Sequence, residues 1–204
     1  RLEELLLTKG LHNELRELER LWSMAQVSVV IQHEQKGLGD AVLCAAEAIG
    51  EEPFAVLLGD SIIRTDECDS FTKHLVSSFQ QYNRSIVGVQ EVAECAKHKF
   101  GVLEGAEFED GTYHAKRLIE KPEKDETDSK VAICARYVFK PQIFEYLKET
   151  QNGKNNEIQL TDAMKKLVVN DGLIGIKMEG DRYDIGDPNG LLLANLSMTE
   201  FGCD

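Results

Sequence analysis

The sequence of 204 residues lacks two features that large classes of protein require: a long apolar run and an excess of positive charge. No apolar stretch approaches the roughly 20 residues needed to cross a bilayer, and no secretory signal opens the chain. The formal net charge of -13 argues against a nucleic-acid partner, because binding to a phosphate backbone needs a dense field of Lys and Arg. We therefore expect neither membrane nor nucleic acid as a partner, and any phosphate ligand to be small and held locally.

Cysteine and histidine patterns for metal or redox chemistry are missing as well. The five cysteines contain no C-x-x-C pair, and their odd number fits reduced thiols better than a disulfide framework. The five histidines show no paired ligand spacing, and no Ser/His/Asp arrangement can be built from the sequence. These absences disfavour zinc and acyl-transfer chemistry, and they predict a cytoplasmic protein.

The chain does contain an alternation of helix and strand patterns. A leucine-rich stretch over 2–24 predicts one or two amphipathic helices broken near Gly10. The strands that we expect from apolar and β-branched runs cover 27–31, 54–58, 85–89, 131–139 and 173–178. The expected helices cover 41–49, 70–82, 141–148, 159–168 and 188–200. This alternation predicts βαβ crossovers, and thus an α/β fold with a mixed, mostly parallel sheet flanked by helices.

A hairpin interrupts this alternation. Asp110-Gly111 separates two strand patterns, 100–104 and 113–119, and is a typical hairpin turn. We find no internal repeat and no linker, so we expect a single domain over 1–204. The chain begins at Arg1 inside a charged amphipathic stretch, and we expect it to be N-terminally incomplete.

Acidic residues follow two strand patterns. Leu57-Leu58-Gly59-Asp60 places a carboxylate at the carboxyl end of an apolar strand, where open α/β sheets bind ligands. Tyr183-Asp184-Ile185-Gly186-Asp187 ends another strand with acids around a glycine. Such oxygen ligands suit a hard cation that bridges phosphates. A cap after the first strand and an Asx turn after the second explain the same residues, so both interpretations stay open.

Two further motifs suit a phosphate ligand. Lys36-Gly37-Leu38-Gly39 lies between a strand and a helix, where glycines let a ligand approach the backbone, although an ordinary tight turn has the same pattern. Glu120-Lys121-Pro122 places a carboxylate and an ammonium group on opposite faces of a strand end. The lysine would neutralise phosphate charge if it faced the crevice, whereas a surface ion pair is the alternative.

Together, these motifs resemble the bacterial UTP-glucose-1-phosphate uridylyltransferases, also called UDP-glucose pyrophosphorylases. The matching segments run over almost the whole chain and are Lys36-Gly37-Leu38-Gly39, Glu52 to Asp60, Phe100-Gly101-Val102, Ile119 to Pro122, Arg136-Tyr137-Val138, Glu157 to Ala163 and Arg182 to Gly186. The resemblance implies a Rossmann-like nucleotidyltransferase fold. It also implies an enzyme that makes UDP-glucose and pyrophosphate from UTP and glucose 1-phosphate with Mg²⁺ as cofactor.

The resemblance implies roles for individual residues. Gln32 and Gly37 would contact uracil, Asp60 and Asp184 would hold the metal, Gly101 and Glu120 would bind sugar hydroxyls, and Lys121 would contact the sugar phosphate. Among these, Lys121 and Asp60 are the expected catalytic residues.

Departures from the family pattern leave other functions open. Family members begin with a strand and a Gly-x-Gly-Thr-Arg loop that wraps the triphosphate, and no such segment occurs here, so we expect this chain to be inactive alone. The alternatives are a sibling nucleotidyltransferase with another base or sugar, and a non-catalytic, regulatory homologue that binds sugar nucleotides. The leucine-rich stretches 2–21 and 188–200 predict a homo-oligomer, although core packing explains them equally well.

Overall fold

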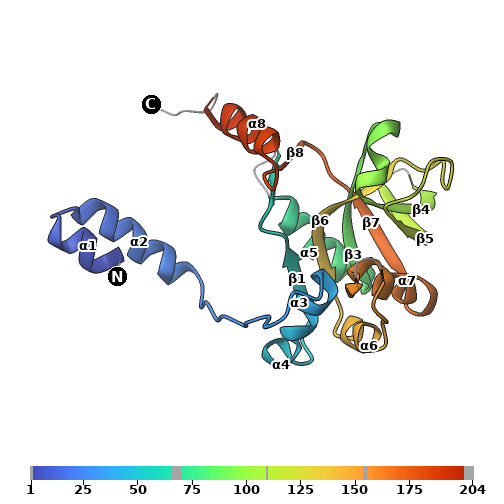
Figure 1. Ribbon diagram of the computed structural model, residues 1–204, viewed down its shortest axis with the longest axis horizontal. Helices are drawn as coiled ribbons and strands as arrows, with labels where there is room; N and C mark the ends of the chain where they lie inside the picture. The colour runs from blue at the N-terminus through green and yellow to red at the C-terminus, as the bar shows by residue number, and fades with distance from the viewer. Residues whose placement is uncertain (1, 66–69, 109, 154–155, 200–204) are drawn as a thin grey trace. The chain divides into compact units, whose positions relative to one another are not determined.

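The computed structural model describes residues 2–65, 70–108, 110–153 and 156–199 (Figure 1). The chain forms two compact units, Arg1–Ile31 and Gln32–Asp204. The assignment of one domain over 1–204 stays a prediction.

The first unit is a pair of helices. Helix α1 (Leu2–Thr8) and helix α2 (His12–Met24) contact each other, and Gly10 between them has a φ of +68°, which confirms the predicted break. The expected strand at 27–31 is wrong: this segment forms no strand, and Val29 is 83% exposed. A β-branched run favours an extended backbone, but a strand needs a hydrogen-bonded partner, and none of the described residues supplies one.

The second unit contains a six-stranded sheet. In spatial order its strands are β1 (Phe54–Leu57), β6 (Val131–Phe139), β3 (Ser85–Glu91), β7 (Leu173–Lys177), β5 (Thr112–Glu120) and β4 (Gly101–Glu107). The mixed α/β fold is confirmed, but the mostly parallel direction is wrong. Among the described pairs, β3–β7 alone is parallel. A βαβ crossover would have placed β1 and β3 side by side and parallel, but β6 lies between these two strands and runs antiparallel to both.

Two short elements escaped prediction and matter for the site. Strand β2 (Ser61–Arg64) pairs with strand β8 (Asp181–Asp184) in a separate antiparallel sheet. A 3₁₀ helix, η1 (Glu94–Lys99), precedes β4. The predicted hairpin is confirmed, since β4 pairs antiparallel with β5, and Asp110 Oδ1 accepts a hydrogen bond from the Thr112 backbone amide in the turn.

Helices cover both faces of the large sheet (Figure 1). One face packs against α3 (Leu38–Cys44), α4 (Ala46–Ile49), α6 (Gln142–Lys148) and α7 (Leu160–Asn170). The other face packs against α5 (Phe71–Tyr82), whose Phe71 and Leu75 are buried. Helix α8 (Pro188–Thr199) contacts β8. None of the helices in the described part of the chain combines the length and the apolar character needed to cross a membrane.

Candidate functional site

A cavity of about 300 Å³ lies where the large sheet meets the small one. Five of the seven predicted site residues line it, namely Asp60, Gly101, Glu120, Lys121 and Asp184. A larger cavity, of about 710 Å³, lies between α5 and the β4–β5 hairpin and contains none of the predicted residues. Because the smaller cavity collects acids and a lysine from strand ends far apart in sequence, we take it as the candidate site.

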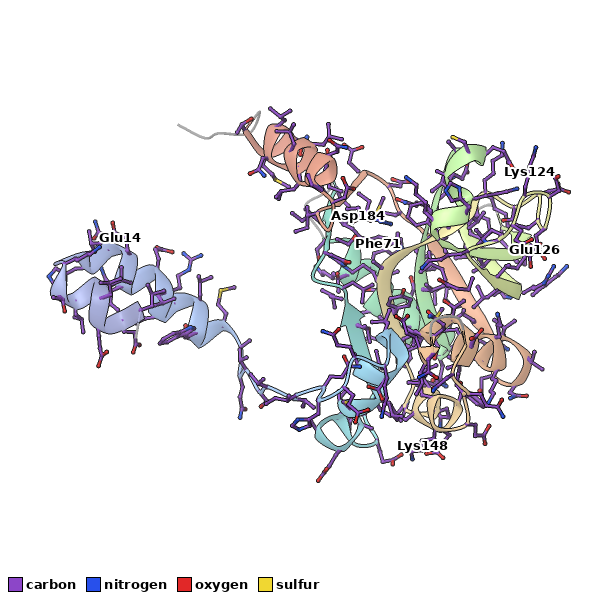
Figure 2. All side chains as sticks on the ribbon, in the orientation of Figure 1. Glu14, Phe71, Lys124, Glu126, Lys148 and Asp184 are labelled. Atoms are coloured by element: carbon purple, nitrogen blue, oxygen red, sulfur yellow. The ribbon has the colours of Figure 1, made fainter. Side chains whose placement is uncertain are left out.

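The small sheet brings Asp60 and Asp184 side by side. Strands β2 and β8 pair Ser61 with Asp184, and the Ile185 amide donates a hydrogen bond to the Asp60 carbonyl over 2.8 Å. The position that a Cβ on Gly186 would occupy lies 3.2 Å from Asp184 Oδ1 and 3.8 Å from Asp60 Oδ2. Figure 2 shows Asp184 at the end of β8. The two carboxylates therefore border one small space.

Glu120 and Lys121 line the cavity together, so their predicted placement on opposite faces is wrong. The reason is the left-handed backbone at Lys121, whose φ is +47°, because strand alternation ends at that residue. The Lys121 ammonium lies 3.9 Å from Glu120 Oε1, and the lysine side chain is 59% exposed. Thr161 at the start of α7 donates a hydrogen bond to Glu120 Oε2 over 2.6 Å. The carboxylate is thus fixed on one oxygen, and the ammonium group faces solvent at the cavity rim.

Two arginines, one lining the cavity and one beside it, were not predicted. Arg182 lines the cavity with its side chain only 8% exposed, lies over the Phe100 ring, and pairs with Asp184 Oδ2 at 3.4 Å. Burial lowers the pKa of the Arg136 guanidinium, and the nearby Asp60 carboxylate opposes that shift. Both arginines occur in segments that carry the family resemblance, and those segments were the one sequence signal that pointed to them.

Gln32 and Gly37 lie together but do not line this cavity. Gln32 Nε2 donates hydrogen bonds to the Gly37 carbonyl, at 3.1 Å, and to Asp40 Oδ2, at 2.6 Å. The next residue, Leu38, does line the cavity. The structure therefore places the two predicted uracil contacts beside the candidate site rather than in it.

Close packing accounts for the glycines of Lys36-Gly37-Leu38-Gly39. Gly37 has a φ of +95°, and a Cβ there would lie 2.8 Å from Glu157 Cβ. A Cβ on Gly39 would lie 2.7 Å from the Ile158 carbonyl oxygen, to which the Gly39 amide donates a hydrogen bond. Both glycines thus let this turn pack closely on the segment before α7, and α7 itself carries Thr161.

We expect Gly39→Ala to lower the free energy of unfolding by about 2 kcal/mol, the usual cost of an added group without space. The obstacle is backbone as well as side chain, so small rotamer changes cannot relieve it. Urea denaturation measures the change. Gly59→Ala is the matched control, since nothing lies within 4 Å of a Cβ on Gly59. Equal stabilities of the two variants would contradict this account of the turn.

Comparisons with known proteins agree with this geometry. A family model described as "Nucleotidyl transferase" matches residues 6–200. The chain is 39% identical over 191 residues to a UTP-glucose-1-phosphate uridylyltransferase of Staphylococcus epidermidis, and the match covers 94% of this chain and 66% of the relative. It is 40% identical over 195 residues to the protein of that name from Bacillus subtilis, and this match covers 96% of this chain and 66% of the relative.

Solved structures give the same result. A structure titled as UDP-glucose pyrophosphorylase complexed with UDP-glucose matches with a TM-score of 0.88 at 37% identity, over 94% of this chain and 73% of that one. The chain thus spans about two thirds of the length of the curated relatives. The predicted resemblance and the predicted nucleotidyltransferase fold are confirmed. On this evidence from sequence, fold and site, the chain belongs to the nucleotidyl transferase family.

Proposed function

We propose that this protein is a UTP-glucose-1-phosphate uridylyltransferase, which makes UDP-glucose and pyrophosphate. One observation carries the proposal: Asp60, Asp184, Glu120 and Lys121 line a single cavity. The names of the relatives support the choice of substrates, and a related structure is titled as a complex with UDP-glucose.

In the proposed reaction, a phosphate oxygen of glucose 1-phosphate attacks the α-phosphorus of UTP. The new P–O bond forms as the bond between the α-phosphorus and its bridging oxygen breaks, and pyrophosphate leaves. Such transfers depend chiefly on alignment and charge neutralisation. Lys121 supplies positive charge at the cavity rim, where it would reduce repulsion between the sugar phosphate and the triphosphate. Glu120, with Oε2 held by Thr161, has its other oxygen available to accept a sugar hydroxyl.

The residues present fit Mg²⁺. The described residues contain no group of three or more His, Cys, Asp or Glu side chains that could hold a metal, so Asp60 and Asp184 would supply two carboxylates at most. Mg²⁺ is commonly bound by one or two carboxylates, with substrate phosphates and water filling the other positions. When bound, the cation would neutralise phosphate charge. The protein's own part is to hold both acids at the ends of paired strands.

The test, made with an otherwise complete enzyme, is pyrophosphate release from UTP, glucose 1-phosphate and Mg²⁺, with dTTP in place of UTP as a parallel reaction. We expect UTP to be the preferred nucleotide. A preference for dTTP would favour the sibling nucleotidyltransferase. Binding of UDP-glucose in calorimetry without any turnover would favour the non-catalytic homologue. The absence of both UDP-glucose binding and turnover would contradict the proposed function.

The Thr161 hydroxyl gives a prediction about the sugar end of the site. Replacing Thr161 by Val keeps the shape but leaves Glu120 Oε2 without its hydrogen bond. We expect KM for glucose 1-phosphate to rise about tenfold, since hydrogen bonds to charged groups contribute about 1.5 kcal/mol or more. Steady-state kinetics measure it, and Thr161→Ser, which keeps the hydroxyl, is the control. A KM for Thr161→Val equal to that of the Ser variant would refute this role.

The remaining expectations stay predictions. Helix α8 exposes Leu191, Leu192, Leu193, Leu196 and Met198, and this apolar surface supports a homo-oligomer. The cytoplasmic location and the absence of a nucleic-acid or membrane partner rest on composition alone. Light scattering of the purified protein measures the oligomeric state.

A further inference from the structure

We infer that Arg136 is a positioning residue that holds the turn carrying Asp60. Its guanidinium donates to three backbone carbonyls: Nη2 to Ser61 at 2.7 Å, and Nη1 to Ala135 at 2.9 Å and to Leu58 at 3.4 Å. Leu58 and Ser61 are the two ends of the turn in which Asp60 lies, because the Ser61 amide donates back to the Leu58 carbonyl. The arginine therefore spans the turn without contacting the cavity.

A bulge in β6 puts Arg136 in this position. Between the pairs Val87–Tyr137 and Val89–Ile133, one residue of β3 faces three residues of β6. The middle one of the three, Ala135, has a φ of +60°, which is uncommon for a residue with a side chain. Bulges often redirect a side chain next to an active site. Here the bulge sends the Arg136 side chain along the end of β1 to the turn at Asp60.

The bonding pattern fits support of a carboxylate rather than binding of a substrate. Within the described ranges, the acceptors of Arg136 are main-chain oxygens of two neighbouring segments, and Arg136 is not among the residues that line the cavity. A guanidinium offers donors in a planar fork, which a lysine ammonium cannot reproduce at three carbonyls. Loss of the fork would leave the Asp60 turn held by the Ser61–Leu58 hydrogen bond and by the Ile185 amide.

The inference rests on the proposed role of Asp60 in holding a divalent cation, and its test uses Mn²⁺ as the probe. Groups that orient a metal ligand typically change affinity by about 10- to 100-fold when removed. We expect Arg136→Met to raise the Kd for Mn²⁺, measured by electron paramagnetic resonance of the free ion, about tenfold, and Arg136→Lys less. Asp60→Asn shows whether the ion is bound at this site. Arg117→Met is the matched control, because the ion pairs of Arg117 in the described part of the chain are with Glu104 and Glu126, which do not line the candidate cavity.

Hydrogen exchange separates positioning from general stability. In Arg136→Met, and in Arg136→Lys should the Met variant not fold, exchange is expected to rise at the Ser61 amide and to stay unchanged at Val87 in the sheet core. Equal rises at both positions, an unchanged Mn²⁺ affinity, or Asp60→Asn binding Mn²⁺ like wild type would each overturn the inference. Turnover is a separate measurement. If an otherwise complete enzyme lacked uridylyltransferase activity while its Mn²⁺ binding still needed Asp60 and Arg136, the proposed function would be refuted and this inference would stand.

Discussion

Replacing Asp60 by Asn is expected to lower kcat for UDP-glucose formation about 100- to 1,000-fold, the usual range for loss of one preorganised electrostatic contact to the transition state. The side chain keeps its size but loses the negative charge that a hard cation requires. Asp184 alone would then face the space that the two carboxylates border. The half-saturating Mg²⁺ concentration should rise in the same titration, since one of two anionic ligands is gone.

Asp181→Asn is the matched control for this experiment. Asp181 lies on the same strand as Asp184 and is exposed, but it does not line the cavity. Its replacement removes an equal charge from the small sheet while leaving both site acids in place. If Asp60→Asn and Asp181→Asn reduced kcat to the same small extent, the effect would be one of general charge, and Asp60 would have no special role.

Local sequence patterns predicted most helices and the hairpin, but not how the strands are paired. An apolar run shows that a strand is buried, whereas its direction depends on partners far away in the chain. The region 131–139 is the clearest case: its sequence predicts a strand, and only the structure shows that this strand runs antiparallel to both neighbours. The strand predicted at 27–31 failed for a related reason, because β-branched composition does not supply a hydrogen-bonding partner.

The candidate site was predictable where motifs follow strands. Asp60 and Lys121 follow strand patterns and Asp184 ends one, and the three residues line one cavity where the two sheets meet. The supporting arginines were not predictable from local pattern, because Arg136 is positioned by a bulge and Arg182 by a short strand, β8, that pairs with the unpredicted β2. Irregular features of this kind depend on tertiary contacts rather than on periodicity.

The charge around the cavity suits the phosphorylated ligands of the proposed reaction, although the protein as a whole is acidic. The chain carries a formal net charge of -13, yet Lys99, Lys121 and Arg182 all line the cavity beside the three acids Asp60, Glu120 and Asp184. A bound divalent cation would make this local balance positive, while the rest of the surface stays negative. Arg182 is nearly buried and pairs with Asp184, whereas Lys99 and Lys121 are both exposed. Of these two lysines, Lys121 is the one that adjoins Glu120, the proposed sugar contact.

Lys121→Ala is therefore expected to cost at least about 2 kcal/mol of transition-state stabilisation, equivalent to about a 30-fold fall in kcat/KM. The ammonium is held only loosely, 3.9 Å from Glu120 and with its side chain 59% exposed, so it can turn toward a phosphate when substrate binds. Alanine is the informative replacement, because it removes the charge without relieving the left-handed backbone at this position, as glycine would.

Lys124→Ala provides the control for Lys121. Lys124 follows three residues later in the loop after β5 (Figure 2) and does not line the candidate cavity, although it borders a neighbouring hollow together with Lys121. If screening of phosphate charge by any nearby lysine were sufficient, the two variants would lose similar amounts of activity. We expect Lys124→Ala to retain nearly all of its kcat/KM, because exposed charges a few residues away are screened by solvent and salt. Unchanged kcat/KM in Lys121→Ala would show that the Lys121 ammonium takes no part in the transfer, and Lys99, Arg182 and the acids that line the cavity would then have to account for catalysis.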